Sequence, residues 1–217
     1  EHARGSLREL GISHKSVPLK DNDFDEDAIR KAVSPSTKMV LIQRSRGYDW
    51  RDSLSIAKIE RACQIVKSIS EEIIVFVDNC YGEFVEDREP LEVGADIIAG
   101  SLIKNPGGGL APRGGYIAGK AELVEASGER LTAPGISEDV SSSLDFNRPA
   151  FQGLFMAPLI VEQALKGAVF SAAYLGAKGY HVSPTATEHR TDIIQCVEFG
   201  DPDKLRKFCQ GIQAASA

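Results

Sequence analysis

A short apolar run that ends on a carboxylate constrains the fold of this chain most. Residues 73–77 read IIVFV, and Asp78 follows them directly. A continuous apolar run of this length fits a strand buried on both faces of a parallel sheet. In open α/β sheets, ligands bind at the carboxyl ends of the strands. We therefore expect an α/β fold in which Asp78 faces a ligand.

A second run of this kind follows shortly after the first. Residues 95–99 read ADIIA and lead into Gly100 and Ser101, and Lys104 stands three residues further on, in front of three consecutive glycines at 107–109. Since neighbouring parallel strands end at the same edge of a sheet, an acid, a hydroxyl and an amine are predicted to lie close together there.

These three groups suit the chemistry of pyridoxal 5'-phosphate. The amine of Lys104 would form an imine with the cofactor, the hydroxyl of Ser101 would donate to its phosphate, and Asp78 would keep its pyridine nitrogen protonated. Partial burial is expected to lower the pKa of Lys104 toward the neutral, nucleophilic amine. The glycines are expected to let the backbone pass close to the cofactor ring.

Each of these residues also has a simpler explanation. An acid after a strand is often a turn or helix-cap residue, a lysine before glycines is often a solvated loop charge, and glycines alone form flexible turns. The order and spacing of Asp78, Ser101 and Lys104 favour the joint interpretation.

Two further residues are candidates for the same site. Arg46, in the loop after an expected strand, has the geometry to bind a carboxylate or a phosphate, and a structural role on the loop explains it equally well. Tyr81, in the turn after Asp78, is a candidate for contact with the cofactor or a partner subunit, the alternative being a packed tyrosine. Four acidic residues without histidine neighbours are expected to form a solvated face rather than a metal site: Glu83, Glu86, Asp87 and Glu89.

Composition limits the remaining possibilities. The 217 residues are 42% hydrophobic and 26% charged, which is typical of a globular protein with one sizeable core. A net charge of -6 gives no basic surface for nucleic acid. No membrane partner is expected, because no apolar run approaches the length of a membrane span. Four widely spaced cysteines without a CxxC pair indicate reduced thiols and a cytoplasmic protein.

Hydrophobic periodicity predicts the other elements. Further strands are expected at 38–43, which should be buried, at 111–119, and at 192–199. Helices are expected at 25–33, 55–70, 120–131, 152–175 and 202–214. The helix at 152–175 is apolar at nearly every turn and is expected to be mostly buried, with a kink at Pro158. The segment 132–147 is expected to be a surface loop that closes over the site or contacts another subunit.

Several segments carry a resemblance to a known family. MVLIQRSRGYDWR, VDNCYGEFVE, GADIIAGSLIKNPGGGLAP, FNRPAFQGLF and RTDIIQ closely resemble the methionine gamma-lyase-related family, whose members are also labelled cystathionine beta-lyase or aluminium resistance proteins. The resemblance implies a fold type I pyridoxal-phosphate enzyme with a three-layer α/β/α large domain and a small α+β domain. It also implies that Lys104 is the Schiff-base lysine and that Asp78 is the partner of the pyridinium.

The resemblance further implies domain boundaries and an activity. Residues 1–150 correspond to a large domain without its N-terminal part, 151–177 to a connecting helix, and 178–217 to the start of the small domain. The implied activity is elimination of a thiol from a sulfur-containing amino acid by a homodimer or homotetramer. An aminotransferase, a racemase and a cofactor-binding fragment without turnover remain alternatives.

Overall fold

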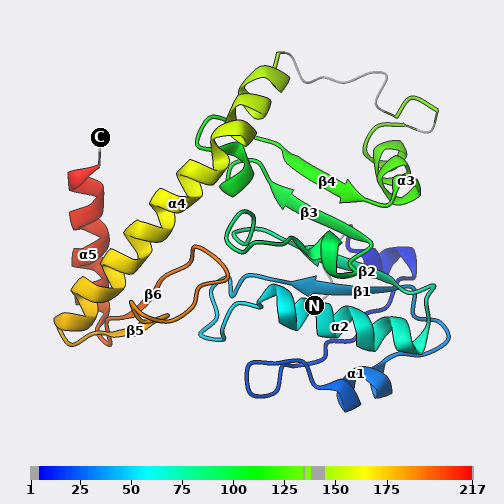
Figure 1. Cartoon of the computed structure of the whole chain (residues 1–217), viewed down its shortest axis with the longest axis horizontal. Coiled ribbons are helices and arrows are strands. Elements are labelled where there is room, and N and C mark those ends of the chain that lie inside the picture. The colour runs from blue at the N-terminus through cyan, green and yellow to red at the C-terminus, as the bar shows by residue number, and fades with distance from the viewer. Residues whose placement is uncertain (1–4, 134, 138–144, 217) are drawn as a thin grey trace.

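The structure, a computed structural model, describes residues 5–133, 135–137 and 145–216 (Figure 1). Its centre is a four-stranded sheet with strand order β1-β2-β3-β4. The strands are β1 (Met39–Gln43), β2 (Ile74–Asp78), β3 (Ile97–Ser101) and β4 (Gly115–Gly119). The first three are parallel, and β4 is antiparallel to β3. The predicted α/β class with a mainly parallel sheet is confirmed.

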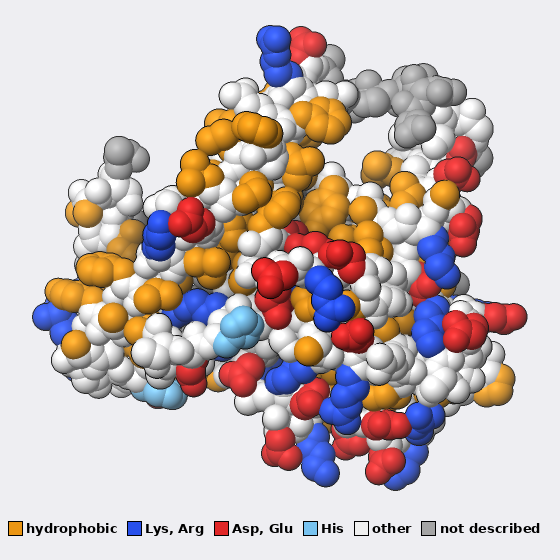
Figure 2. Space-filling view, viewed as in Figure 1, with side chains coloured by type: hydrophobic (Ala, Val, Ile, Leu, Met, Phe, Trp, Pro, Cys, Tyr) orange, Lys and Arg blue, Asp and Glu red, His pale blue; other side chains and the backbone are white. Residues whose placement is uncertain are grey.

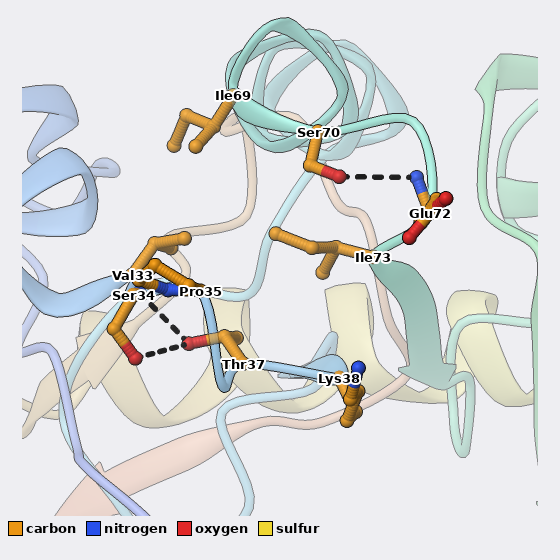
Figure 3. Close-up of a pocket in the computed structure, with 9 residues that line it drawn as sticks. All are labelled: Val33, Ser34, Pro35, Thr37, Lys38, Ile69, Ser70, Glu72 and Ile73. Carbon is orange, nitrogen blue, oxygen red and sulfur yellow. Dashed lines mark hydrogen bonds between the residues drawn. The ribbon is translucent and has the colours of Figure 1, made fainter.

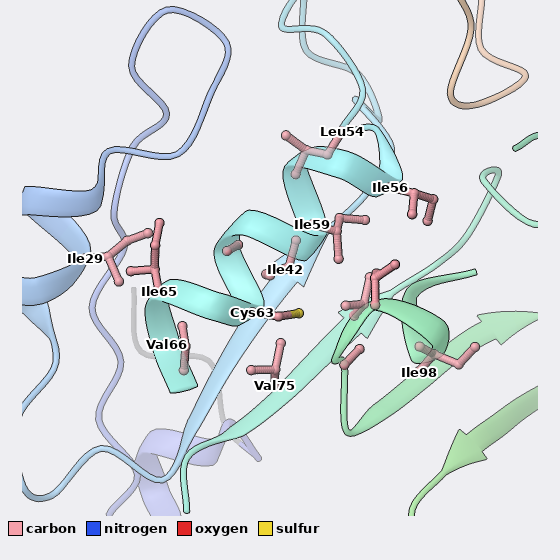
Figure 4. Packing of buried hydrophobic residues seen from close by; sticks show 14 of the residues in the cluster. Ile29, Ile42, Leu54, Ile56, Ile59, Cys63, Ile65, Val66, Val75 and Ile98 are labelled. Atoms are coloured by element: carbon pink, nitrogen blue, oxygen red, sulfur yellow. The ribbon is translucent and has the colours of Figure 1, made fainter. Parts of the chain in front are cut away.

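Helices α1 (Glu26–Ala32) and α2 (Ile56–Ile69) contribute to the core on one face of this sheet. Each helix is capped at its amino end by a side chain that accepts a hydrogen bond from a backbone N–H of the first turn. Asp25 caps α1 in this way, and Ser55 caps α2. The periodic apolar residues of α2 point inward, so that Ile59 and Val66 pack in one cluster with Val75 of β2 (Figure 4). Burial of this stripe is what fixes α2 on the sheet.

The opposite face of the sheet is much less covered. Because strand residues alternate between faces, Val75 and Val77 point to the helical side and the residues between them point away. Leu41 on the outer face is 63% exposed, and Met39 and Ile117 are also exposed. The expectation that residues 38–43 and 73–77 are fully buried strands is therefore wrong, because helices cover only the inner face among the described residues.

Helix α4 (Asn147–Ala177) was predicted to be mostly buried, and this is also wrong. Hydrophobic side chains gather along its surface in the space-filling view (Figure 2), and its exposed residues include Phe151, Phe155 and Phe170. By length and composition alone, it is long and apolar enough to cross a membrane, contrary to the expectation that no segment would be. Core helices of water-soluble proteins pass the same test. The helix runs through Pro158 without ending there.

The remaining elements precede and follow α4 in the sequence. Helix α3 (Ala121–Leu131) follows β4, as predicted. After α4 come β5 (His181–Ser183), β6 (Cys196–Glu198) and α5 (Pro202–Ala215), with β5 antiparallel to β6. The second strand is shorter than the predicted 192–199, and α5 matches its prediction within one residue. Half of the predicted closing loop, at 134 and 138–144, lies outside the described residues.

Candidate functional site

The carboxyl edge of the sheet brings Asp78 and Ser101 together. Asp78 ends β2 and pairs in register with Ala99 of β3, and Ser101 lies two residues beyond Ala99. Two residues along a strand return to the same face, so Asp78 and Ser101 both lie on the face opposite α2. The N–H of Cys80 donates to Oδ1 of Asp78 at 3.1 Å. The Cys80 thiol also hydrogen-bonds the Asp78 carboxylate. Within the described part of the chain, no hydrogen bond engages the Ser101 hydroxyl, so it is available to a ligand.

Lys104 lies in the turn that follows β3. Its N–H donates to the carbonyl of Ser101 at 3.2 Å, and its Nζ lies 4.3 Å from the centre of the Tyr81 ring. Tyr81 itself has a left-handed backbone, with φ of 70°, which turns the loop after β2 toward the lysine. The structure therefore places Asp78, Ser101, Lys104 and Tyr81 in one neighbourhood at the end of β2 and β3.

The predicted lowering of the Lys104 pKa is wrong. Burial does act to lower the pKa of Lys104, but the hydrogen bond to Cys80 and the acidic groups of Cys80, Tyr81 and Asp78 together raise it above its ordinary value. Burial and the nearby Asp78 raise the pKa of the Cys80 thiol in turn. Lys104 is thus held as an ammonium in this arrangement, because its neighbours favour the charged form more than partial burial disfavours it.

Two of the glycines after Lys104 lie close to neighbouring backbone. A side chain at Gly107 would collide with the carbonyl of Leu102, and one at Gly108 would collide with the carbonyl of Gly153 in α4, whereas one at Gly109 would meet no atom within 4 Å. Gly107 ends the short 3-10 helix η3 (Asn105–Gly107), and Gly108 follows it. These close approaches require glycine at 107 and 108. The expected approach of the glycines to a cofactor ring stays a prediction.

Arg46 is engaged with other parts of the chain. It is almost fully buried, and its Nη1 donates to the carbonyl of Ser183 at 3.2 Å and to the Ser183 hydroxyl at 2.9 Å. Its backbone N–H donates to Asp192 at 3.3 Å. These contacts favour the structural alternative, in which Arg46 ties the loop after β1 to the C-terminal segment.

The predicted solvated acidic face is wrong for three of its four members. Arg44, which is fully buried, donates to Glu86 at 2.9 Å and to Glu89 at 3.3 Å, and Glu83 is only 3% exposed. Asp87 alone is exposed, as expected. No local pattern indicates this pairing, because the partner arginine lies about forty positions away along the chain.

Glu83 is a buried acid that sequence reasoning missed as a candidate. The hydroxyl of Tyr116 donates to its Oε1 at 2.9 Å, and Asn79 lies 3.4 Å from that hydroxyl. Burial raises the pKa of Glu83 to about 7, and the charge of Glu89 acts in the same direction. The sequence feature that could have indicated a buried cluster here is the pair of glycines Gly82 and Gly100. The room at Gly82 is taken by Arg44, and the room at Gly100 by Glu83 and Tyr116.

Two cavities lie away from Lys104. One, of about 290 Å³, is lined by Thr37, Lys38 and Ile73 next to the amino ends of β1 and β2 (Figure 3), which is the edge opposite Asp78. The other, of about 310 Å³, is lined by Arg46 and lies between the loop after β1 and the segment around His189. Neither is lined by Lys104, so the candidate site is defined by side chains at the carboxyl edge of the sheet.

The fold and this edge define a class: α/β proteins that present an acid, a hydroxyl and an amine at the ends of adjacent parallel strands. A family model described as methionine gamma-lyase matches residues 1–217, and the chain belongs to this family.

Several relatives extend over the whole chain. The uncharacterized protein YnbB of Bacillus subtilis is 52% identical over 98% of this chain and 51% of its own length. The crystal structure of a candidate cystathionine beta-lyase involved in aluminum resistance from Listeria monocytogenes is 54% identical, with a TM-score of 0.97 over 100% of this chain and 54% of that one. A carbon-sulfur lyase involved in aluminum resistance from Clostridium novyi is 47% identical, with a TM-score of 0.94 over 99% of this chain and 51% of that one. The chain thus spans about half the length of these relatives.

Proposed function

We propose that this protein is a pyridoxal-phosphate-dependent lyase that cleaves the carbon-sulfur bond of a sulfur-containing amino acid. The observation that carries the proposal is the meeting of Asp78, Ser101 and Lys104 at the ends of two adjacent strands. The family and the names of the relatives from Listeria monocytogenes and Clostridium novyi support a carbon-sulfur lyase.

The residues at this edge fit the proposed cofactor. Asp78 keeps one carboxylate oxygen on the Cys80 N–H, which orients the other toward a ring nitrogen. Ser101 offers a hydroxyl to a phosphate, and Lys104 offers the amine that holds the cofactor. When bound, the cofactor would supply the electron sink that the reaction needs. Arg46 is left out of this set, because Ser183 already occupies its guanidinium.

Lys104 would also move the protons of the reaction. With cofactor and substrate bound, the amine of Lys104 would accept the proton of the substrate carbon next to the amino group and would return a proton to the departing sulfur. The products of such an elimination would be a thiol and, with uptake of one water, a keto acid and ammonia. Tyr81, whose ring lies over Nζ of Lys104, would restrict the directions in which that amine moves.

The proposal extends to the architecture. A fold type I large domain over residues 1–150, a connecting helix over 151–177 and a small domain from 178 on would place the site between domains and subunits. The exposed apolar side chains of Leu41, Ile117 and α4 support a further protein layer over these surfaces, from a homodimer or homotetramer or from more of the same chain.

A spectrum tests the cofactor. The protein, incubated with pyridoxal phosphate, is expected to show a visible absorbance band that Lys104→Ala lacks. Lys166→Ala, which removes an exposed lysine of α4, serves as the matched control and should keep the band. A parent protein without the band would overturn the proposal.

The products separate a lyase from an aminotransferase. With cystathionine, methionine or cysteine, a lyase releases thiol, ammonia and keto acid without a second substrate. Keto acid that forms only when an amino-group acceptor is added would instead establish the aminotransferase.

A further inference from the structure

We propose that Glu83 is a positioning residue for Lys104: its buried side chain, in the neutral acid form, holds together the end of β3, the turn after β3 and the loop after β2. The catalytic meaning of this inference rests on the proposed function. The geometry and the first part of the test do not depend on it.

The carboxyl group of Glu83 fills a space left by a missing side chain. A Cβ at Gly100 would collide with Oε1 of Glu83 and with the ring of Tyr116. Gly100 directly precedes Ser101 in β3, and the Tyr116 hydroxyl holds Oε1 from β4 at 2.9 Å. The end of β3 is therefore packed directly against this carboxyl group.

The backbone of Glu83 anchors the turn that carries the lysine. The side-chain amide of Asn105 donates to the Glu83 carbonyl at 3.0 Å, and Asn105 directly follows Lys104. Cys80 and Tyr81, which contact Lys104, stand three and two positions before Glu83 in the same loop. Movement of Glu83 would thus be passed to Lys104 from both sides.

Burial and the charge of Glu89 favour the neutral form of Glu83, whereas the charge of Arg44 favours the ionised form. Arg44, which directly follows β1, directs its hydrogen bonds to Asn79, Glu86 and Glu89. In the part of the chain that the structure describes, no cation donates a hydrogen bond to Glu83. Glu86 and Glu89 add negative charge from the same loop, and Tyr116 on β4 gives a neutral donor. Lys104 lies on the neighbouring turn, and its own contacts are with Cys80 and Tyr81.

Two buried oxygens without hydrogen-bond partners also favour the neutral form of Glu83. Oε2 of Glu83 and Oδ1 of Asn105 are both buried without a hydrogen-bond partner among the described residues. A proton on Oε2 of Glu83 makes this oxygen a hydrogen-bond donor. Oδ1 of Asn105, in the same cluster, is an acceptor that lacks a donor. Ionisation would instead leave a buried charge beside it. The raised pKa of Glu83, about 7, agrees with this direction.

Chemical labelling of Lys104 tests the inference without cofactor. The rate at which acetic anhydride modifies Lys104 is followed by peptide mass spectrometry from about pH 5 to about pH 9. An isolated amine gains about tenfold in rate per pH unit below its pKa. We expect the slope for Lys104 to change near pH 7, because ionisation of the buried Glu83 would disturb the loop and the turn that hold Lys104.

Three variants give the contrast. Glu83→Gln mimics the neutral acid and is expected to lose the break near pH 7, whereas Asp87→Asn removes an exposed charge of the same loop and should keep it. Tyr116→Phe removes the donor that stabilises the charged form, so the break should move to higher pH. Profiles of Glu83→Gln and the parent that superimpose would overturn the inference.

The cofactor spectrum separates this inference from the proposed function. A parent without the visible band contradicts the function, while the labelling profile still decides the role of Glu83. Where the band forms, its absorbance plotted against pH should show a break near pH 7 in the parent and in Asp87→Asn, and no break in Glu83→Gln. A break retained in Glu83→Gln would count against Glu83.

Discussion

Asp96 connects the sheet to its neighbours through a single carboxylate. It is 4% exposed and accepts hydrogen bonds from Nζ of Lys67, Nζ of Lys120 and the N–H of Val75, each at 2.7 Å. Burial acts to raise the pKa of Asp96, but the hydrogen bonds from Lys120, Lys67 and Val75 outweigh it and lower the pKa. The charged carboxylate is therefore the form that the folded protein stabilises.

Asp96→Asn is expected to lower the free energy of unfolding by about 3 kcal/mol, because Lys67, whose side chain is only 17% exposed, loses its counter-charge. Urea denaturation measures the change. Asp203→Asn breaks an exposed pair with Arg206 and should cost less than about 1 kcal/mol. Equal effects of the two variants would contradict the role given to Asp96.

Gly100→Ala is expected to lower the free energy of unfolding by about 1–3 kcal/mol, because the new methyl group meets Glu83 and Tyr116 in a packed space. Thermal denaturation followed by circular dichroism reports it. Gly167→Ala on α4 meets no atom within 4 Å, so it should be neutral or stabilise by up to about 1 kcal/mol. A neutral Gly100→Ala would show that Glu83 does not need this space.

At the scale of elements, helix α2 depends on Ser55, the residue that caps its amino end. The Ser55 hydroxyl accepts the N–H of Lys58 at 3.2 Å, so Ser55→Ala is expected to destabilise the protein by about 1 kcal/mol in urea denaturation. The matched control is Ser216→Ala at the exposed end of α5, where the hydroxyl donates to a helix carbonyl and caps no N–H. A loss at Ser216 as large as at Ser55 would argue against a specific capping effect.

The elements themselves were largely predictable from the sequence. The apolar stripe of residues 55–70 gave α2 within one residue at each end, and the runs before Asp78 and Ser101 gave β2 and β3. Burial was not predictable in the same way. An all-round apolar helix such as α4 indicates that a partner surface exists somewhere, but the helix sequence does not contain that surface.

The candidate site, too, could be predicted from the sequence only in part. Strand ends and register depend on local pattern, which is why Asp78, Ser101 and Lys104 were correctly expected at one edge of the sheet. The burial of Glu83 and the raised pKa of Lys104 depend on side chains that only tertiary folding brings near. A run of acids looks solvated in sequence whether or not an arginine such as Arg44 lies beneath it.

For the whole molecule, three buried groups give stability a dependence on pH. The pKa of Asp96 is lowered on folding, so its contribution is present above the unfolded value and is lost as pH falls through the folded pKa. Burial raises the pKa of Glu83 to about 7 and that of Cys63 to about 11. Their contributions are complete below the unfolded pKa values and are lost as pH rises through the folded ones.

These signs predict a maximum of stability on the acid side of neutrality. The free energy of unfolding should fall at low pH as Asp96 takes up a proton, and should fall again, by up to about 3 kcal/mol, between about pH 4.5 and 7, where Glu83 is ionised in the unfolded chain and neutral in the folded one. Urea denaturation at a series of pH values, without cofactor, measures the profile. Glu83→Gln should remove the decline between about pH 4.5 and 7 and leave the acid decline in place, whereas Asp87→Asn should change neither. A decline in this window that persists in Glu83→Gln would assign it to another group.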